Sequence, residues 1–137
     1  MYQHGGALNA ATSEDYTTYY FSIQNECFDK ALDMFSQFFK SPLFTASATE
    51  REMNAVDNEL KMRLSDDNRR LNQIEKELTL PNHPLKHFST GNLQTLNKPN
   101  IHKLLLEYYE SHYSANLMSL CLVANYSLDQ LEDLAIT

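Results

Sequence analysis

The sequence predicts an α+β fold in which helices pack on one face of a mainly antiparallel sheet. Two strand-like segments near the N-terminus are followed by three helical segments, then by an apolar strand-like run and a last helix. The length of 137 residues fits one domain or one piece of a larger domain.

A β-hairpin is expected near the N-terminus. Residues 16–23 are rich in Tyr, Thr and Phe, which favour strands, and residues 9–12 form a shorter strand-like segment before them. Ser13, Glu14 and Asp15 lie between the two segments and are typical turn residues. We therefore expect the two strands to pair with each other.

The first helix is predicted from an apolar stripe with spacings of three, four and seven residues. It ends before Ser41-Pro42, because the residue that precedes a proline is disfavoured in the helical conformation. We interpret the stripe as core rather than as a ligand pocket. Its members are Phe28, Ala31, Leu32, Phe35, Phe38 and Phe39.

A long second helix is expected to start near Ser47, which stands at capping-box spacing from Glu50. It runs to just before Pro81, and residues 66–68 are where it is expected to fray or bend.

The C-terminal third of the sequence predicts three further elements. A third helix covers about residues 101–113, and Ser127 caps a last helix over residues 128–135. Residues 117–124 form a nearly continuous apolar run, which is typical of a strand buried on both faces.

Composition excludes several classes of function. The net charge of -7 argues against a nucleic-acid surface, which needs clustered Lys and Arg. No apolar stretch approaches the roughly 18 residues of a membrane helix, and the first residues lack the apolar core of a signal peptide. Cys27 and Cys121 lie far apart in apolar patterns, so we expect reduced, buried thiols and a cytoplasmic location.

Two carboxylates in the second helix stand out. Glu52 and Glu59 are seven residues apart, close to two helical turns, so they share one face. Glu59 also borders the apolar positions Val56 and Leu60, where a carboxylate needs a charged or metal partner. On the residues alone, the simpler interpretation is an ion pair between Glu59 and Arg63 on the solvent face.

The histidines do not form a recognisable metal motif. Neither H-x-x-E-H nor H-E-x-x-H occurs. His83 and His87 have the spacing of a helical metal pair, but Pro84 lies between them, so we interpret them as loop histidines. The others are His4, His102 and His112.

Several segments match one family pattern in order. Residues 5–12 look like a glycine-led edge strand, and the run from Arg51 to Glu59 looks like a glutamate-bearing helix. The further matching segments are residues 16–21, 38–44, 82–84, 88–92 and 113–118. Together they resemble the insulinase-type (M16, inverzincin) zinc metallopeptidases, and most closely the insulin-degrading-enzyme branch.

The resemblance implies roles for individual residues. Glu59 matches the glutamate that is the third zinc ligand, and Glu52 matches a carboxylate that supports the metal site. Asn9, Ala10 and Ala11 match the edge strand to which a peptide substrate adds through backbone hydrogen bonds.

The sequence departs from the family pattern in two places. Arg69 stands where an aromatic residue is common in the insulin-degrading branch, which puts substrate contacts there in doubt. The H-x-x-E-H helix, which supplies two histidine ligands and the general base, is absent from these residues.

The resemblance thus implies that residues 1–137 are a partial N-terminal M16 domain from a zinc metalloendopeptidase, which hydrolyses peptides with metal-activated water. A catalytic zinc needs three protein ligands, so we expect this chain to be inactive alone. The alternative is a non-catalytic peptide-binding or scaffold module of the same family. Glu52 and Glu59 favour the catalytic lineage, because an inactive domain has no metal to hold. The expected partners are peptide substrates and the remainder of the parent protease or a homologous chain, without nucleic acid or membrane.

Overall fold

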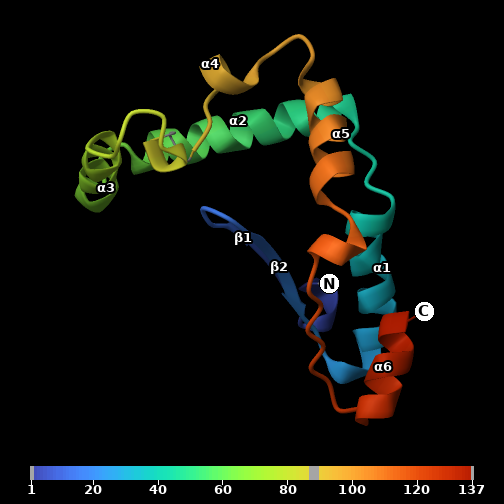
Figure 1. The fold of residues 1–137 in the computed structure, drawn as a ribbon. Coiled ribbons are helices and arrows are strands. Elements are labelled where there is room, and N and C mark those ends of the chain that lie inside the picture. Colours follow the sequence, from blue (N-terminus) through green and yellow to red (C-terminus); the bar gives the residue numbers. More distant parts are fainter. Residues whose placement is uncertain (1, 87–89, 137) are drawn as a thin grey trace. The chain divides into compact units, whose positions relative to one another are not determined.

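The computed structural model describes residues 2–86 and 90–136, and it falls into two units (Figure 1). The first, which we call the hairpin unit, comprises Met1–Pro42 and Tyr113–Thr137. The second, the helical unit, comprises Leu43–His112. The predicted α+β class is confirmed, because the chain combines helices with an antiparallel sheet.

The hairpin unit contains the predicted β-hairpin. Strands β1 (Ala7–Thr12) and β2 (Thr17–Ser22) pair antiparallel, with Ala10 opposite Tyr19, and the predicted turn residues join them. The other elements of this unit are η1 (Tyr2–His4), η2 (Asn25–Cys27), α1 (Phe28–Lys40), η4 (Ala115–Leu117) and α6 (Leu128–Ile136).

Helix α1 packs its predicted apolar stripe against one face of the hairpin. Side chains alternate along a strand, so Tyr19 and Phe21 of β2 share this face. The ring centroid of Phe21 lies 4.8 Å from that of Phe35, and the ring of Tyr19 meets Phe39 edge-on at 5.3 Å. The buried apolar residues of the described chain all belong to this helix: Phe28, Ala31, Leu32 and Phe35.

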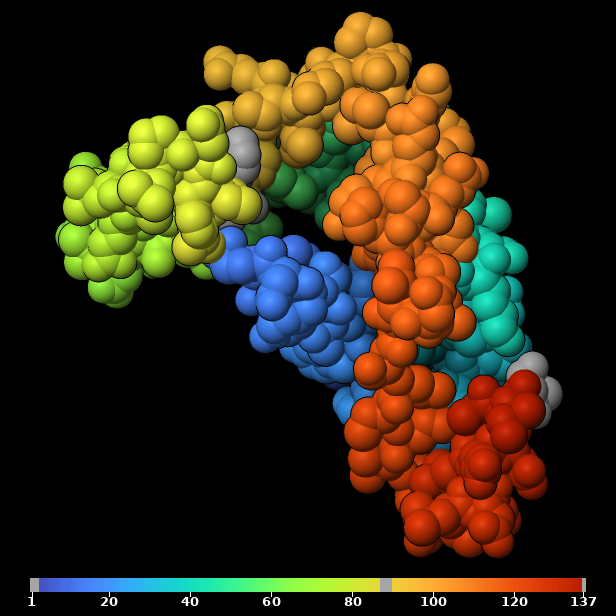
Figure 2. Space-filling model, in the orientation of Figure 1, coloured from blue at the N-terminus to red at the C-terminus, as the bar shows by residue number. Residues whose placement is uncertain are grey.

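The strand predicted over residues 117–124 is wrong. Leu117 ends the short helix η4, and the residues after it have no regular structure. Leu120 is 60% exposed and Val123 is 85% exposed, and the chain after Tyr113 lies at the surface of the hairpin unit (orange to red in Figure 2). A strand forms only beside a hydrogen-bonded neighbour, and no described strand pairs with this run. For the same reason the expected burial of Cys121 is wrong, since this free thiol is exposed.

The helical unit is built from α2 (Ala46–Arg63), α3 (Asp67–Glu77), η3 (Pro84–Lys86), α4 (Leu93–Leu96) and α5 (Ile101–His112). The predicted third helix is confirmed as α5, and the last helix is confirmed in the hairpin unit, where the Ser127 hydroxyl accepts a hydrogen bond from the Gln130 amide. Helix α2 begins one residue before the predicted start, because Thr45 rather than Ser47 caps it through the Ala48 amide.

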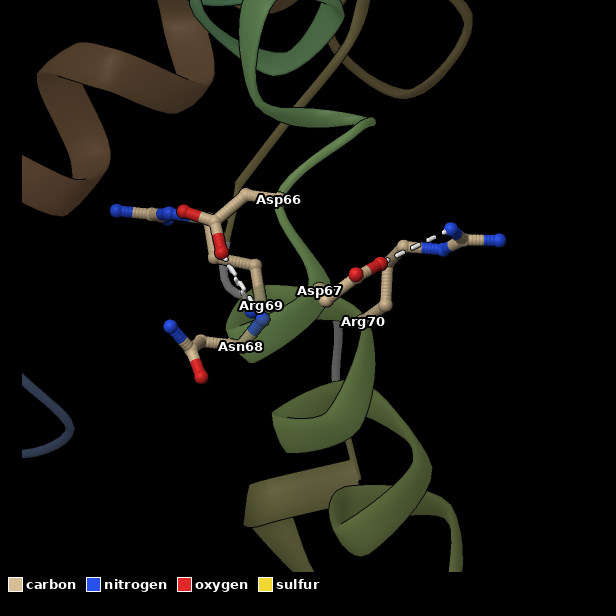
Figure 3. Close-up of polar contacts among 5 residues, drawn as sticks. All are labelled: Asp66, Asp67, Asn68, Arg69 and Arg70. Carbon is tan, nitrogen blue, oxygen red and sulfur yellow. Dashed lines mark hydrogen bonds and ion pairs between the residues drawn. The ribbon is translucent and has the colours of Figure 1, made fainter.

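The predicted single long helix is two helices, and it divides where the acidic residues were expected to bend it. Asp66 adopts an extended backbone conformation, and its carboxylate accepts hydrogen bonds from the amides of Asn68 (2.9 Å) and Arg69 (3.3 Å), as Figure 3 shows. Asp67 pairs with Arg70 one turn later (3.2 Å). An N-cap of this kind favours a new helix start over continuation of the old helix.

Candidate functional site

The candidate peptide-binding edge lies on β1. Asn9, Ala10 and Ala11 are exposed, and β1 pairs with β2 alone among the strands that the structure describes. The Ser13 amide bonds to the Tyr16 carbonyl, and the hydrogen-bonded pairs of an antiparallel hairpin alternate, so the Ala10–Tyr19 pair is a non-hydrogen-bonded one and the Ala10 amide points away from β2. This amide donates a hydrogen bond to the Asn9 side-chain oxygen (2.8 Å). The backbone of Ala10 is therefore available at the outer edge, with its donor held by the neighbouring side chain.

A hollow of about 290 Å³ adjoins this edge. Its walls come from β1, from Tyr19 of β2 and from Phe35 and Phe38 of α1, and they are almost wholly apolar. Phe38 is 52% exposed there. The hollow belongs to the face of the hairpin that α1 covers.

The carboxylates of α2 have different surroundings. Glu59 forms an ion pair with Arg63 (2.7 Å), and 43% of its side chain is exposed. This is the pairing that the simpler interpretation of the sequence predicts. Glu52 is exposed and makes no ion pair with another described residue.

The buried carboxylate of α2 is Asp57, which the sequence analysis did not identify. It accepts a hydrogen bond from the Leu93 amide (3.0 Å) at the start of α4, and it forms an ion pair with Lys61 (2.6 Å). The Leu93 amide, and then the Lys61 ammonium, lower the pKa of the Asp57 carboxyl below its ordinary value. The hydrogen bond from the Leu93 amide to Asp57 thus holds residues 92–96 against α2. The two residues are 36 positions apart, so no local sequence pattern indicates this contact.

Three of the described histidines form hydrogen bonds with the backbone. His102 donates from Nε2 to the Phe44 carbonyl (2.7 Å), His112 donates to the Tyr108 carbonyl (3.0 Å), and His83 accepts from the Leu85 amide (3.2 Å). The predicted loop position of His83 is confirmed, while His87 lies outside the described residues.

The residues do not by themselves fit a zinc ion. Within residues 2–86 and 90–136, no group of three His, Cys, Asp or Glu side chains is placed to hold a metal ion. Glu59, the carboxylate matched to the family's ligand, is occupied by Arg63. A catalytic zinc needs three such ligands, so no hydrolytic step is assigned to this chain.

None of the helices that the structure describes combines the length and the apolar character needed to cross a membrane.

Two family models match the sequence. The one described as insulinase (peptidase family M16) matches residues 1–82, and the one described as peptidase M16 inactive domain matches residues 101–136. This chain belongs to the insulinase family. The resemblance deduced from the ordered segments is confirmed.

Known insulinase-family proteins match nearly the whole chain. "Insulin-degrading enzyme-like 1, peroxisomal" of Arabidopsis thaliana is 44% identical over 96% of this chain, and the human insulin-degrading enzyme is 42% identical over 98%. The crystal structure of pitrilysin superposes with a TM-score of 0.90 at 37% identity, over 98% of this chain and 15% of that one. The chain spans 14% of the length of each of the two curated relatives.

Proposed function

We propose that this chain is a segment of a zinc metalloendopeptidase domain, and that its own contribution is the peptide-binding edge of β1 together with one metal ligand, Glu59. Family membership and the similarity to insulin-degrading enzymes support the proposal. The observation that carries it is the uncovered backbone of Ala10 on an exposed strand. Within residues 1–137, taken as part of an N-terminal M16 domain, Glu52 supports the metal site.

Peptide binding follows from the hydrogen-bonding capacity of the strand edge. An extended peptide beside β1 places a carbonyl where the Asn9 side-chain oxygen now accepts from the Ala10 amide. The hydrogen bond from the Ala10 amide to the bound peptide replaces the existing one to Asn9, so the Asn9 side chain has to turn away. Backbone pairing of this kind accepts many sequences, because it does not depend on the side chains of the peptide.

The test of this edge is a titration of the chain into a labelled extended peptide, followed by fluorescence anisotropy. Replacing Ala10 by Pro removes the amide donor and is expected to abolish binding, whereas Ala10→Ser keeps the donor and is expected to bind as the unmodified chain does. Circular dichroism of both variants establishes that the fold is retained. Equal affinity of the two variants would rule out strand addition at Ala10.

Catalysis is tested separately. The chain is incubated with zinc and a quenched fluorescent peptide, with and without a chelator. We expect no chelator-sensitive turnover, because one carboxylate does not make a catalytic zinc site. Turnover that the chelator abolishes would show that this expectation is wrong.

A non-catalytic peptide-binding or scaffold module is the second candidate. The match of residues 101–136 to a model described as an inactive domain favours it. The two candidates differ at Glu59: a ligand position requires the carboxylate for zinc binding once the remaining ligands are supplied, whereas a scaffold does not. The two candidates are separated by isothermal titration of zinc into a complex of this chain with a polypeptide that supplies the remaining zinc ligands. Glu59→Gln is the test variant, and Glu52→Gln, on the same face of the helix, is compared with it.

We place the protein in the cytoplasm, on the basis of its two free cysteines. One relative is named as peroxisomal, so the peroxisome is the alternative location to test. Fluorescence microscopy of a tagged chain beside a peroxisomal marker decides between the two.

A further inference from the structure

Helix α3 carries an apolar stripe that the described chain leaves largely exposed. Leu71, Ile74 and Leu78 follow one another at spacings of three and four residues, so they share one face of the helix and its C-terminal cap. Their exposed fractions are 56%, 58% and 82%. The stripe of α1 has the same helical period but is largely buried in the hairpin unit. The stripe of α3 is therefore an amphipathic face without a partner, and such a face favours association.

The charges beside this stripe complement a second copy of the same helix. Arg70 and Glu77 are seven residues apart, and each stands one position before a leucine of the stripe, so both flank the stripe on the same side. When two such helices lie antiparallel, Arg70 of one copy comes beside Glu77 of the other, and symmetry forms the reverse pair as well. Leu71 of each copy then lies beside Ile74 of the other. One surface thus supplies both halves of a contact in which opposite charges meet twice.

The ends of the helix favour this antiparallel orientation. Asp66 caps the N-terminus of α3 and Asp67 is its first residue. A parallel pair would bring these carboxylates of the two copies together, whereas an antiparallel pair keeps them at opposite ends. Antiparallel helices also place the positive end of each dipole beside the negative end of the other.

The ion pairs that Arg70 and Glu77 now form are weak. Arg70 pairs with Asp67 (3.2 Å) and Glu77 pairs with Lys86 (3.8 Å), and all four side chains are exposed. Exposed ion pairs contribute little to stability, so exchanging them for pairs between two copies costs little.

The net charge of the chain lies away from α3. The hairpin unit holds eight of the 18 acidic residues but only two of the 11 basic residues. The helical unit has ten acidic and nine basic residues, so its net charge is -1. Helix α3 itself has three of each. The surface around the stripe therefore carries no excess charge that would repel a second copy.

We propose that the chain forms a symmetric homodimer through α3, in which the stripes of two copies pack antiparallel and Arg70 pairs with Glu77 in both directions. Three apolar side chains from each copy make a small contact. Weak encounters bury less than about 1,200 Å² in total, so we expect a dissociation constant on the order of 0.1 mM. The proposal goes beyond peptide binding at β1 and does not depend on it, because α3 belongs to the helical unit and β1 to the hairpin unit.

Sedimentation equilibrium of the full chain, at concentrations from about 0.01 to 1 mM, measures the dimer. We expect the average mass to rise from that of a monomer toward that of a dimer. Arg70→Glu and Glu77→Arg each place like charges opposite one another, and each is expected to weaken dimerisation at least about tenfold. An equimolar mixture of the two variants restores opposite charges in both pairs, so it is expected to dimerise about as tightly as the unmodified chain.

A second pair of variants tests the apolar stripe. Ile74→Lys puts a charge at its centre and is expected to weaken dimerisation at least about tenfold. Leu43→Lys makes the same change of charge at an exposed leucine outside α3 and is expected to leave dimerisation unchanged. All four variants change exposed residues, so circular dichroism of the free chains is expected to be unaltered.

Four results would overturn the proposal. One is a chain that stays monomeric up to about 1 mM, since the stripe would then serve a different protein. Another is a Glu77→Arg variant that dimerises like the unmodified chain, which would exclude the antiparallel pairing. The third is a mixture of Arg70→Glu and Glu77→Arg that associates no better than either alone. The last is an equal loss in Ile74→Lys and Leu43→Lys. Peptide anisotropy at β1 is recorded on the same samples, so failure of dimerisation and failure of peptide binding are told apart.

Discussion

Strand β2 and the run Met118–Val123 belong to the same unit and have similar strand-forming sequences, yet only β2 forms a strand. β2 has β1 beside it and α1 against one face, with Phe21 packed on Phe35. The run after Met118 has neither a paired neighbour nor a covering layer among the described residues, and Val123 is 85% exposed. The difference teaches that strand propensity becomes a strand only where another segment completes it.

The same contrast recurs at smaller scale on α2. Asp57 and Glu59 are two residues apart and both have a cation four residues further on. Asp57 also accepts a hydrogen bond from the Leu93 amide and is buried, whereas among the described residues Glu59 pairs with Arg63 alone, and 43% of its side chain is exposed. A long-range partner, rather than the type of residue, decides which of the two is structural.

The largest expected effect is a difference in unfolding free energy between a substitution in the packed face of α1 and one in the exposed residues 118–123. Phe35→Ala removes a ring that packs against Phe21 and Phe39, and it is expected to cost about 3 kcal/mol of unfolding free energy. Leu120→Ala is expected to change it by less than about 0.5 kcal/mol, because the side chain is already in solvent. Urea unfolding followed by circular dichroism measures both. Similar losses would mean that residues 118–123 are packed in solution.

The next effect compares the two carboxylates. Asp57→Ala leaves the Leu93 amide without its acceptor and is expected to lower the melting temperature and loosen residues 92–96. Glu59→Ala breaks an exposed pair and is expected to change the unfolding free energy by no more than about 0.5 kcal/mol. Thermal melts of the two variants, made side by side, test the order. If Glu59→Ala were the more damaging, the assignment of Asp57 as the structural carboxylate would be wrong.

The pH dependence of stability also distinguishes Asp57 from Glu59. The pKa of Asp57 is lowered in the folded chain, first by the Leu93 amide and then by Lys61. A depressed carboxyl pKa contributes stability above the ordinary value of 3.8, and that stability is lost as the pH falls below it. Stability is therefore expected to drop as the pH falls below about 4, and less steeply in Asp57→Asn. An identical acid slope in the variant would exclude this carboxyl as the source.

The smallest effect lies at alkaline pH in the hairpin unit. Burial, and then the hydrogen bond to the Tyr19 hydroxyl (2.6 Å), raise the pKa of Tyr113 from 10.0 to about 12. The raised pKa favours the neutral phenol, so its contribution is present below pH 10 and is lost as the pH rises from about 10 to 12. Tyr113→Phe should flatten this decline, as measured by melts across that range. A decline that persists unchanged would place the titrating group elsewhere.

The sequence predicted the elements whose information is local. The hairpin, α1 and α5 follow from turn residues, apolar period and a proline stop within a few residues of each element. The sequence predicts that the helix frays or bends at residues 66–68 but not that it divides there, because the cap of Asp66 depends on a backbone geometry that the helical period does not reveal. The strand prediction for residues 117–124 is wrong, because their apolar pattern indicates burial on both faces and the described residues do not cover either face of this run.

The candidate site divides in the same way. The ion pair of Glu59 with Arg63 was foreseen from i,i+4 spacing. Asp57 was not, because its decisive partner is the Leu93 amide, 36 residues away. The roles of Asn9, Ala10, Ala11, Glu52 and Glu59 in peptide and metal binding came from resemblance to the family, and they stay predictions.

Amide hydrogen exchange on the isolated chain tests most directly whether residues Met118–Val123 lack a partner while the hairpin has one. We predict that the amides of residues 119–123 exchange at rates close to those of an unfolded peptide, while the amides bonded between β1 and β2 and those of α1 are protected. Protection of residues 119–123 equal to that of α1, in a chain shown to be monomeric, would contradict the account.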